Sequence, residues 1–387
     1  MRLKRVMAVV FLLVLRKTLA VADGPVVSGI LESRADFAAG AGDERDFSYG
    51  LEEYANLRMQ FAIREQAVLY GAFNLIAASG NAARAVVAGG FSGSAHSAGE
   101  NYAAALELER LYLRINGGHF DTEAGLIRLA FGYGQVWGSS DFLNPRSPLF
   151  PDARKRAVLG MAFSAYPSDT ARLRGFGSAP KNPLSAGGKG AVFGCSGDQH
   201  WDRLSLQGLY AFEVPREEST WGIHRAGLSL KLEAEAGFMA DMLYTYDRKA
   251  NPGMDGLSAG GGFDYSFFKG RFYWLTEYLF NGVHSDTAKS PENADGLSKR
   301  HYLYSMILYR LTDYTNLSLA CTAGLTDCSF SPVLTAEHVL FQGFVLSLSG
   351  RVPLDRDLFA KNGKTGELGP KQTGTRAVIN FLARLRF

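Results

Sequence analysis

The chain has 387 residues, of which 47% are hydrophobic, with 41 Lys and Arg against 38 Asp and Glu. Several of the basic residues stand at the very start, before residue 18, so the rest of the chain is close to neutral. No run of basic residues is interleaved with aromatic ones, which argues against nucleic-acid binding.

Residues 1–22 have the pattern of a cleaved signal peptide. Basic residues precede an apolar run from Val6 to Leu15, and Ala20-Val21-Ala22 supplies the small residues of a cleavage site. The run is shorter than the roughly 20 residues that a membrane-spanning helix needs. We therefore expect export and a mature chain of 23–387, with an uncleaved anchor as the minor alternative.

From there to the end of the chain, segment after segment alternates apolar and polar residues. Leu57, Met59 and Phe61 alternate with Arg58 and Gln60, and the same period of two recurs at 204–212, 223–232, 237–247 and 257–267. Side chains of a strand point alternately to opposite faces. Many such strands of about ten residues predict an all-β, transmembrane, antiparallel up-and-down barrel, formed as one domain by residues 23–387.

Connection lengths support the barrel because short turns alternate with longer loops along the chain. We expect long outer loops at 78–101, 133–154, 282–299 and 354–372. The pattern gives 18 strands if one strand begins near Lys189, and 16 or 14 if doubtful hairpins are removed. An array of secreted β-sandwiches is the alternative, but it explains neither the long series of one-sided strands nor the missing linkers.

The last strand ends on an aromatic residue, and Phe381, Leu385 and Phe387 share its apolar face. In these features the chain resembles outer-membrane porin-type proteins. The terminal aromatic is similar to the signal that the barrel-assembly machinery recognises in that class. The resemblance implies location in the outer membrane of a diderm bacterium, with outer-membrane lipids and the assembly machinery as partners.

One segment, "GYGQVWGSSDFLNPRSPLFPDARKR", combines prolines that exclude regular structure with many charges. The pattern is similar to that of alginate-export and other substrate-selective porins. Two interpretations of this loop stay open: it folds inward and lines a constriction with charges of both signs, or it is a surface loop stiffened by its prolines. The constriction candidates are Asp141, Arg146, Asp152, Arg154, Lys155 and Arg156.

Basic residues are also frequent at positions that the alternation assigns to the inside of the barrel, and inward basic rings favour anions. They would have no such effect where they pair with acids or lie at the rims. The wall candidates are Arg58, Arg128, Arg174, Arg225 and Lys231.

No motif for catalysis, a metal or a cofactor is present: the seven histidines are scattered, and no nucleophile motif occurs. A disulfide between Cys321 and Cys328 stays open. We expect a non-enzymatic porin or selective channel for small hydrophilic, anionic solutes. A barrel similar to fatty-acid transporters, which carries hydrophobic compounds, and a surface adhesin or structural barrel are the alternatives. Association of identical chains is left open.

Overall fold

The computed structural model describes residues 25–40, 47–83, 95–98, 101–144, 157–179, 190–214, 222–247, 256–282, 301–354, 368 and 375–387. The expected signal peptide, 1–22, lies outside these residues. So do the loop candidates Arg146, Asp152, Arg154, Lys155 and Arg156. None of the helices in the described ranges is long and apolar enough to span a membrane.

The described chain is built almost entirely of strands. They are β1 (Val26–Gly40), β2 (Phe47–Arg64), β3 (Ala67–Gly80), β4 (Ala95–Ala98), β5 (Tyr102–Asn116), β6 (Phe120–Ile127), β7 (Val158–Ser168), β8 (Ala171–Ser178), β9 (Val192–Trp201), β10 (Leu204–Glu213), β11 (Ile223–Glu233), β12 (Gly237–Tyr246), β13 (Leu257–Phe267), β14 (Phe272–Asn281), β15 (His301–Arg310), β16 (Thr315–Gly324), β17 (Ser329–Phe341), β18 (Phe344–Arg351) and β19 (Thr375–Arg386).

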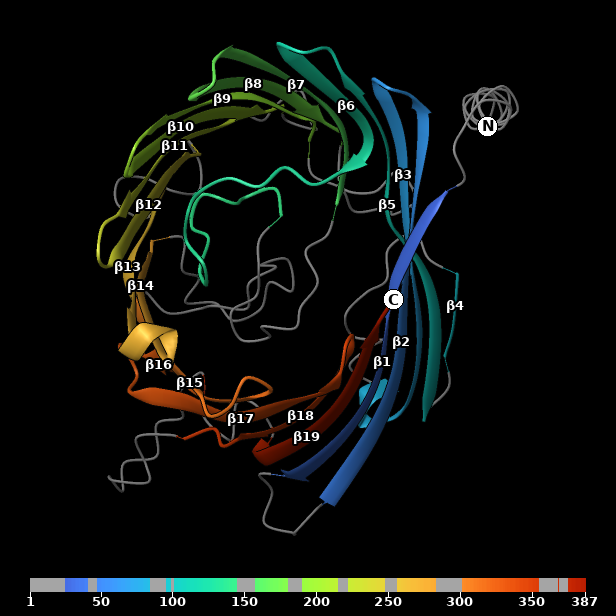
Figure 1. Ribbon diagram of the computed structural model, residues 1–387. Coiled ribbons are helices and arrows are strands. Elements are labelled where there is room, and N and C mark those ends of the chain that lie inside the picture. Colours follow the sequence, from blue (N-terminus) through green and yellow to red (C-terminus); the bar gives the residue numbers. More distant parts are fainter. Residues whose placement is uncertain are drawn as a thin grey trace.

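Neighbouring strands pair antiparallel around a closed ring, which Figure 1 shows from one end. The last strand, β19, pairs with β1 over Ile30–Gly40 and closes the sheet. The short β4 is an addition beside β5, because β3 and β5 pair directly with each other. The barrel therefore has 18 strands, and the prediction of an antiparallel up-and-down barrel is confirmed.

The two faces of the wall differ as the alternation predicts. Large apolar side chains such as Phe47, Met161 and Leu334 are exposed on the outside. Polar side chains such as Asp198 and Gln207 are buried on the inside. A lipid environment offers no partners for backbone groups, and a closed sheet pairs them all between strands. The apolar face is therefore the one that meets the bilayer.

The short turns also follow the prediction. The strand expected near Lys189 is β9, which begins at Val192 and restores the alternation of short and long connections. The connection after β6 differs, since it begins directly after Ile127 and lasts until Val158, longer than the expected 133–154. The three cysteines, Cys195, Cys321 and Cys328, are free thiols.

The chain terminus completes the closure. The Phe387 N–H donates to the Gly29 carbonyl at 3.1 Å, and the Gly29 N–H donates to the Phe387 carbonyl at 2.8 Å. The Phe387 ring lies over Gly29, where a Cβ atom would meet it at 2.5 Å. Phe381 and Phe387 are exposed on the outer face. Recognition of this strand by the assembly machinery stays a prediction.

Replacing Phe387 with Asp should strongly reduce the amount of barrel in the outer membrane, because a charge would replace the ring at the seam between β19 and β1. Phe47→Asp, at an exposed aromatic position away from the seam, is the control. The measurement is the amount of heat-modifiable protein in purified outer membranes. Equal amounts of the Phe387 variant and wild type would contradict this role of the terminus.

Candidate functional site

The segment that follows β6 lies inside the barrel. Residues 128–144 leave the wall and enter the space enclosed by the strands, as Figure 1 shows. Their backbone and side chains contact the inner face of the wall from β7 to β15. We call this segment the inner loop. Its position confirms that the connection after β6 turns inward.

An apolar cluster attaches the first part of the inner loop to the wall. Leu129, Phe131 and Leu143 are buried against inward apolar residues of β7 to β12. The Phe131 ring lies 5.1 Å from the Phe176 ring of β8, centre to centre. Burial of each large apolar side chain contributes about 1.5–3 kcal/mol. The loop is therefore packed against one side of the barrel, and the space between the loop and that wall is filled.

A wall carboxylate holds the next turn of the inner loop. Asp241 of β12 accepts the backbone N–H groups of Tyr133 at 2.9 Å and Gly134 at 2.6 Å. Beside it, Gln207 of β10 accepts the N–H of Gly132 at 2.7 Å.

A second carboxylate binds the following residues in the same way. Glu277 of β14 accepts the N–H groups of Gln135 at 2.6 Å, Val136 at 3.1 Å and Trp137 at 3.2 Å. The Trp137 indole N–H donates to the Glu277 carbonyl at 3.0 Å, and its ring packs on Tyr302. Consecutive N–H groups that converge on an anion form a nest. Here the wall itself supplies the anion.

Glycines make this approach possible. A Cβ atom on Gly132, whose φ is +85°, would lie 2.9 Å from an Asp241 oxygen, and one on Gly134 would lie 2.7 Å from it. On the wall, a Cβ atom on Gly260 would lie 2.8 Å from the Ser139 hydroxyl of the loop. The glycine run of β13 thus leaves room for the loop.

Asp241 and Glu277 stand at positions that the alternation assigns to the inner face, but the sequence analysis did not identify them as anchors. The residues opposite Asp241 are Ser229 and Gly260, and those opposite Glu277 are Gly262 and Tyr304. Neither acid therefore has a basic neighbour across the sheet. A buried inward acid without such a neighbour must find donors elsewhere, and this signal could have identified both anchors.

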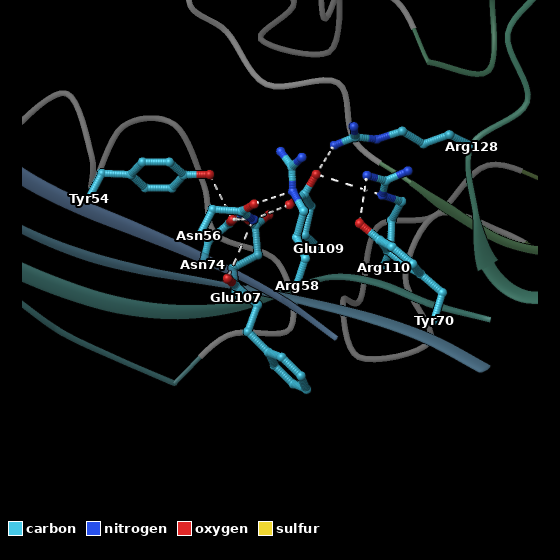
Figure 2. Close-up of polar contacts among 10 residues, drawn as sticks. Tyr54, Asn56, Arg58, Tyr70, Asn74, Glu107, Glu109, Arg110 and Arg128 are labelled. Carbon is cyan, nitrogen blue, oxygen red and sulfur yellow. Dashed lines mark hydrogen bonds and ion pairs between the residues drawn. The ribbon is translucent and has the colours of Figure 1, made fainter. Parts of the chain in front are cut away.

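The wall from β2 to β5 carries a network of polar side chains, shown in Figure 2. Asn56 donates to Glu109 at 2.5 Å and to Asn74 at 2.7 Å. Arg128, the first residue of the inner loop, donates to Glu109 at 2.6 Å. This ion pair ties the start of the loop to β5, whereas the two anchors hold its middle on β12 and β14.

Three of the predicted wall candidates lie near this network or on the inner face of β8. Arg58 donates through Nε to the Asn56 side chain at 2.6 Å. Arg174 donates through Nε to the Ser164 hydroxyl at 3.3 Å. Arg128 belongs to the loop rather than to a strand, and it pairs with Glu109. Within the described residues, the side-chain hydrogen bonds of Arg58 and Arg174 therefore go to neutral groups.

The other described candidates bind partners within the protein. Arg225 is buried, forms an ion pair with Glu213 at 2.8 Å, and lies over the ring of Phe142. Lys231 pairs with Glu233 beside the turn after β11. Asp141 is 3% exposed and accepts the N–H of Asn144 within the loop. These three residues are already engaged with partners in the protein.

No family model matches the chain, and no curated protein matches its sequence. Solved structures of similar fold are OccAB4 of Acinetobacter baumannii, and OccK8 (OprE) and OpdQ of Pseudomonas aeruginosa. Each has a TM-score of 0.56 and 9–10% identity, over 94–95% of this chain and 98% of that one. These proteins are outer-membrane porins, and this chain has the same barrel fold.

Replacing both anchors, as Asp241→Asn with Glu277→Gln, should release the inner loop. Hydrogen bonds to charged groups contribute about 1.5–3 kcal/mol each, and the amides accept fewer N–H groups and add unmatched donors. We expect larger single-channel conductance and more open-channel noise in planar bilayers.

The control is Asp264→Asn, an inward carboxylate of the neighbouring strand β13. Within the described residues no backbone N–H of the loop donates to it. If this variant changes the channel as much as the double variant does, or if the double variant behaves as wild type, the two carboxylates do not hold the loop.

Proposed function

We propose that the protein is a diffusion channel of the outer membrane that passes small hydrophilic solutes and prefers anions. It carries out transport without catalysis. The observation that carries the proposal is the inner loop: its described contacts fix it to β5 and to β7–β15, and none of them is to the polar inner face of β16–β19 and β1–β3.

The charges of the wall support the preference for anions. The anchors Asp241 and Glu277 accept N–H groups of the loop, which stabilise their negative charge without cancelling it. Other inward acids pair with arginines, as Asp198 does with Arg172 and Glu32 does with Arg384. These pairs neutralise both signs, and Arg58 and Arg174, which hydrogen-bond to neutral groups, add positive charge to the field in the lumen.

Arg58→Gln combined with Arg174→Gln should shift the zero-current potential in a salt gradient toward cations. Both changes remove a positive charge and keep a hydrogen-bonding group. Because screening shortens to about 3 Å at 1 M ionic strength, the shift should shrink as salt is raised.

The matched control is Lys269→Gln, which removes one positive charge from the exposed turn between β13 and β14. Its selectivity should equal that of wild type. An anion preference that survives unchanged in the Arg58 and Arg174 double variant would refute the role of these two residues.

We further propose that the charged end of the loop, outside the described residues, adds to this field. The triple variant Arg146→Ser, Arg154→Ser and Arg156→Ser should then move selectivity toward cations and enlarge conductance. If both quantities stay at their wild-type values, this part of the loop is not the constriction, and selectivity rests on the wall.

A further inference from the structure

Two matching groups of side chains lie on the outer face of the barrel. In each, a Tyr and a Phe alternate on one strand, and a His lies directly opposite the Phe on the next strand. The Tyr hydroxyl is 2.7 Å from Nδ1 of the His in both groups. We call them the His–Tyr groups; they consist of Tyr210, Phe212 and His224 on β10 and β11, and of Tyr278, Phe280 and His301 on β14 and β15. The same geometry, formed twice by different hairpins, points to a shared role.

The place of the two groups in the barrel fixes their surroundings. Tyr210 and Tyr278 belong to the exposed outer face. His224 is the second residue of β11 and His301 the first of β15, so they follow the connections after β10 and β14. The turns at the other ends of these strands are short, and in outer-membrane barrels the short turns are periplasmic and the longer loops external. Outward side chains at these strand ends therefore meet the lipid headgroups of the outer leaflet, the level at which aromatic residues gather.

Each imidazole has one nitrogen committed and one available. Nδ1 is used by the Tyr hydroxyl, and within the described residues no protein group hydrogen-bonds to Nε2 of His224 or His301. The ring is also packed: the Phe212 ring centre lies 4.9 Å from that of His224, and the Phe280 ring centre 5.5 Å from that of His301. Two contacts thus hold each imidazole in place, and Nε2 lies on the side of the ring away from the hydroxyl. Because a Tyr hydroxyl can either donate or accept, the pair suits both the neutral and the protonated ring.

We propose that each His–Tyr group binds a phosphate group of an outer-leaflet lipid through Nε2 of its His. An anion beside Nε2 favours the ring states in which this nitrogen carries a proton, and the protonated ring adds a charge-assisted hydrogen bond. A neutral acceptor, such as water or a sugar hydroxyl, gains less from that charge. The phosphate is therefore the headgroup component that complements the site best. The Tyr acts as a positioning residue, because it holds the ring without touching the phosphate.

The test is a lipid titration of the purified protein in detergent, followed by native mass spectrometry. The probe is lipid A, a glycolipid that carries phosphate groups, compared with the same lipid after removal of its phosphates. Wild type should bind one molecule of lipid A at each group, and the dephosphorylated form about tenfold more weakly, since hydrogen bonds to charged groups are the stronger class. His224→Phe combined with His301→Phe, which keeps an aromatic ring at each position, should lower the affinity for lipid A by a similar factor.

The matched control is His338→Phe. His338 is also exposed on the outer face, with its Nδ1 2.9 Å from the Thr315 hydroxyl. It stands beside the short turn between β17 and β18, at the opposite end of the barrel from the two groups. This variant should bind lipid A as wild type does, because it faces the other leaflet.

Tyr210→Phe combined with Tyr278→Phe tests the positioning role and keeps both imidazoles. It should reduce the preference for the phosphorylated lipid and leave the affinity for the dephosphorylated lipid unchanged. Wild type that binds both forms of the lipid equally, or binds inorganic phosphate as tightly as lipid A, would overturn the proposal. So would lipid A binding that is unchanged in the double His variant, or that His338→Phe lowers as much. Lipid binding is measured apart from conductance, so failure here leaves the proposed channel untouched.

Discussion

The pairing of backbone hydrogen bonds within lipid is the constraint on which the rest of this structure depends. A sheet can satisfy every N–H and C=O in a bilayer only if it has no edge. The chain meets this requirement by joining β19 to β1, with Gly29 and Phe387 exchanging the last pair of bonds. Closure then divides each strand into a face for lipid and a face for the lumen, which is the alternation that the sequence displays.

The inner loop meets the same requirement by other means. Its backbone is irregular, so the N–H groups from Gly132 to Trp137 have no partners in a sheet. The wall supplies Gln207, Asp241 and Glu277 as acceptors, and the glycines of the loop allow these groups to come close. The acids that fix the loop keep their negative charge, and their oxygens bind the N–H groups of the loop.

The sequence predicted the architecture well because alternation of apolar and polar residues over about ten positions indicates a strand with one apolar and one polar face. Closure and the short turns followed from that pattern and from connection lengths, and 18 was one of the three strand numbers that they allowed. The inward turn of the segment after β6 was one of two open alternatives, and the structure shows it for residues 128–144.

The site was less predictable because parity tells which face a residue occupies but not what it touches there. Arg225 and Lys231 share the inward parity of Arg174, yet Arg225 and Lys231 pair with Glu213 and Glu233. Asp241 and Glu277 meet the loop from positions more than 100 residues away along the chain. Such contacts depend on how the loop crosses the lumen, which no local pattern encodes.

The most direct test of the central claim is a single-channel recording of the wild-type protein in planar bilayers under a salt gradient. Discrete, stable conductance steps with a zero-current potential on the anion side are predicted. A barrel that inserts but passes no current, or one that prefers cations, would contradict the account.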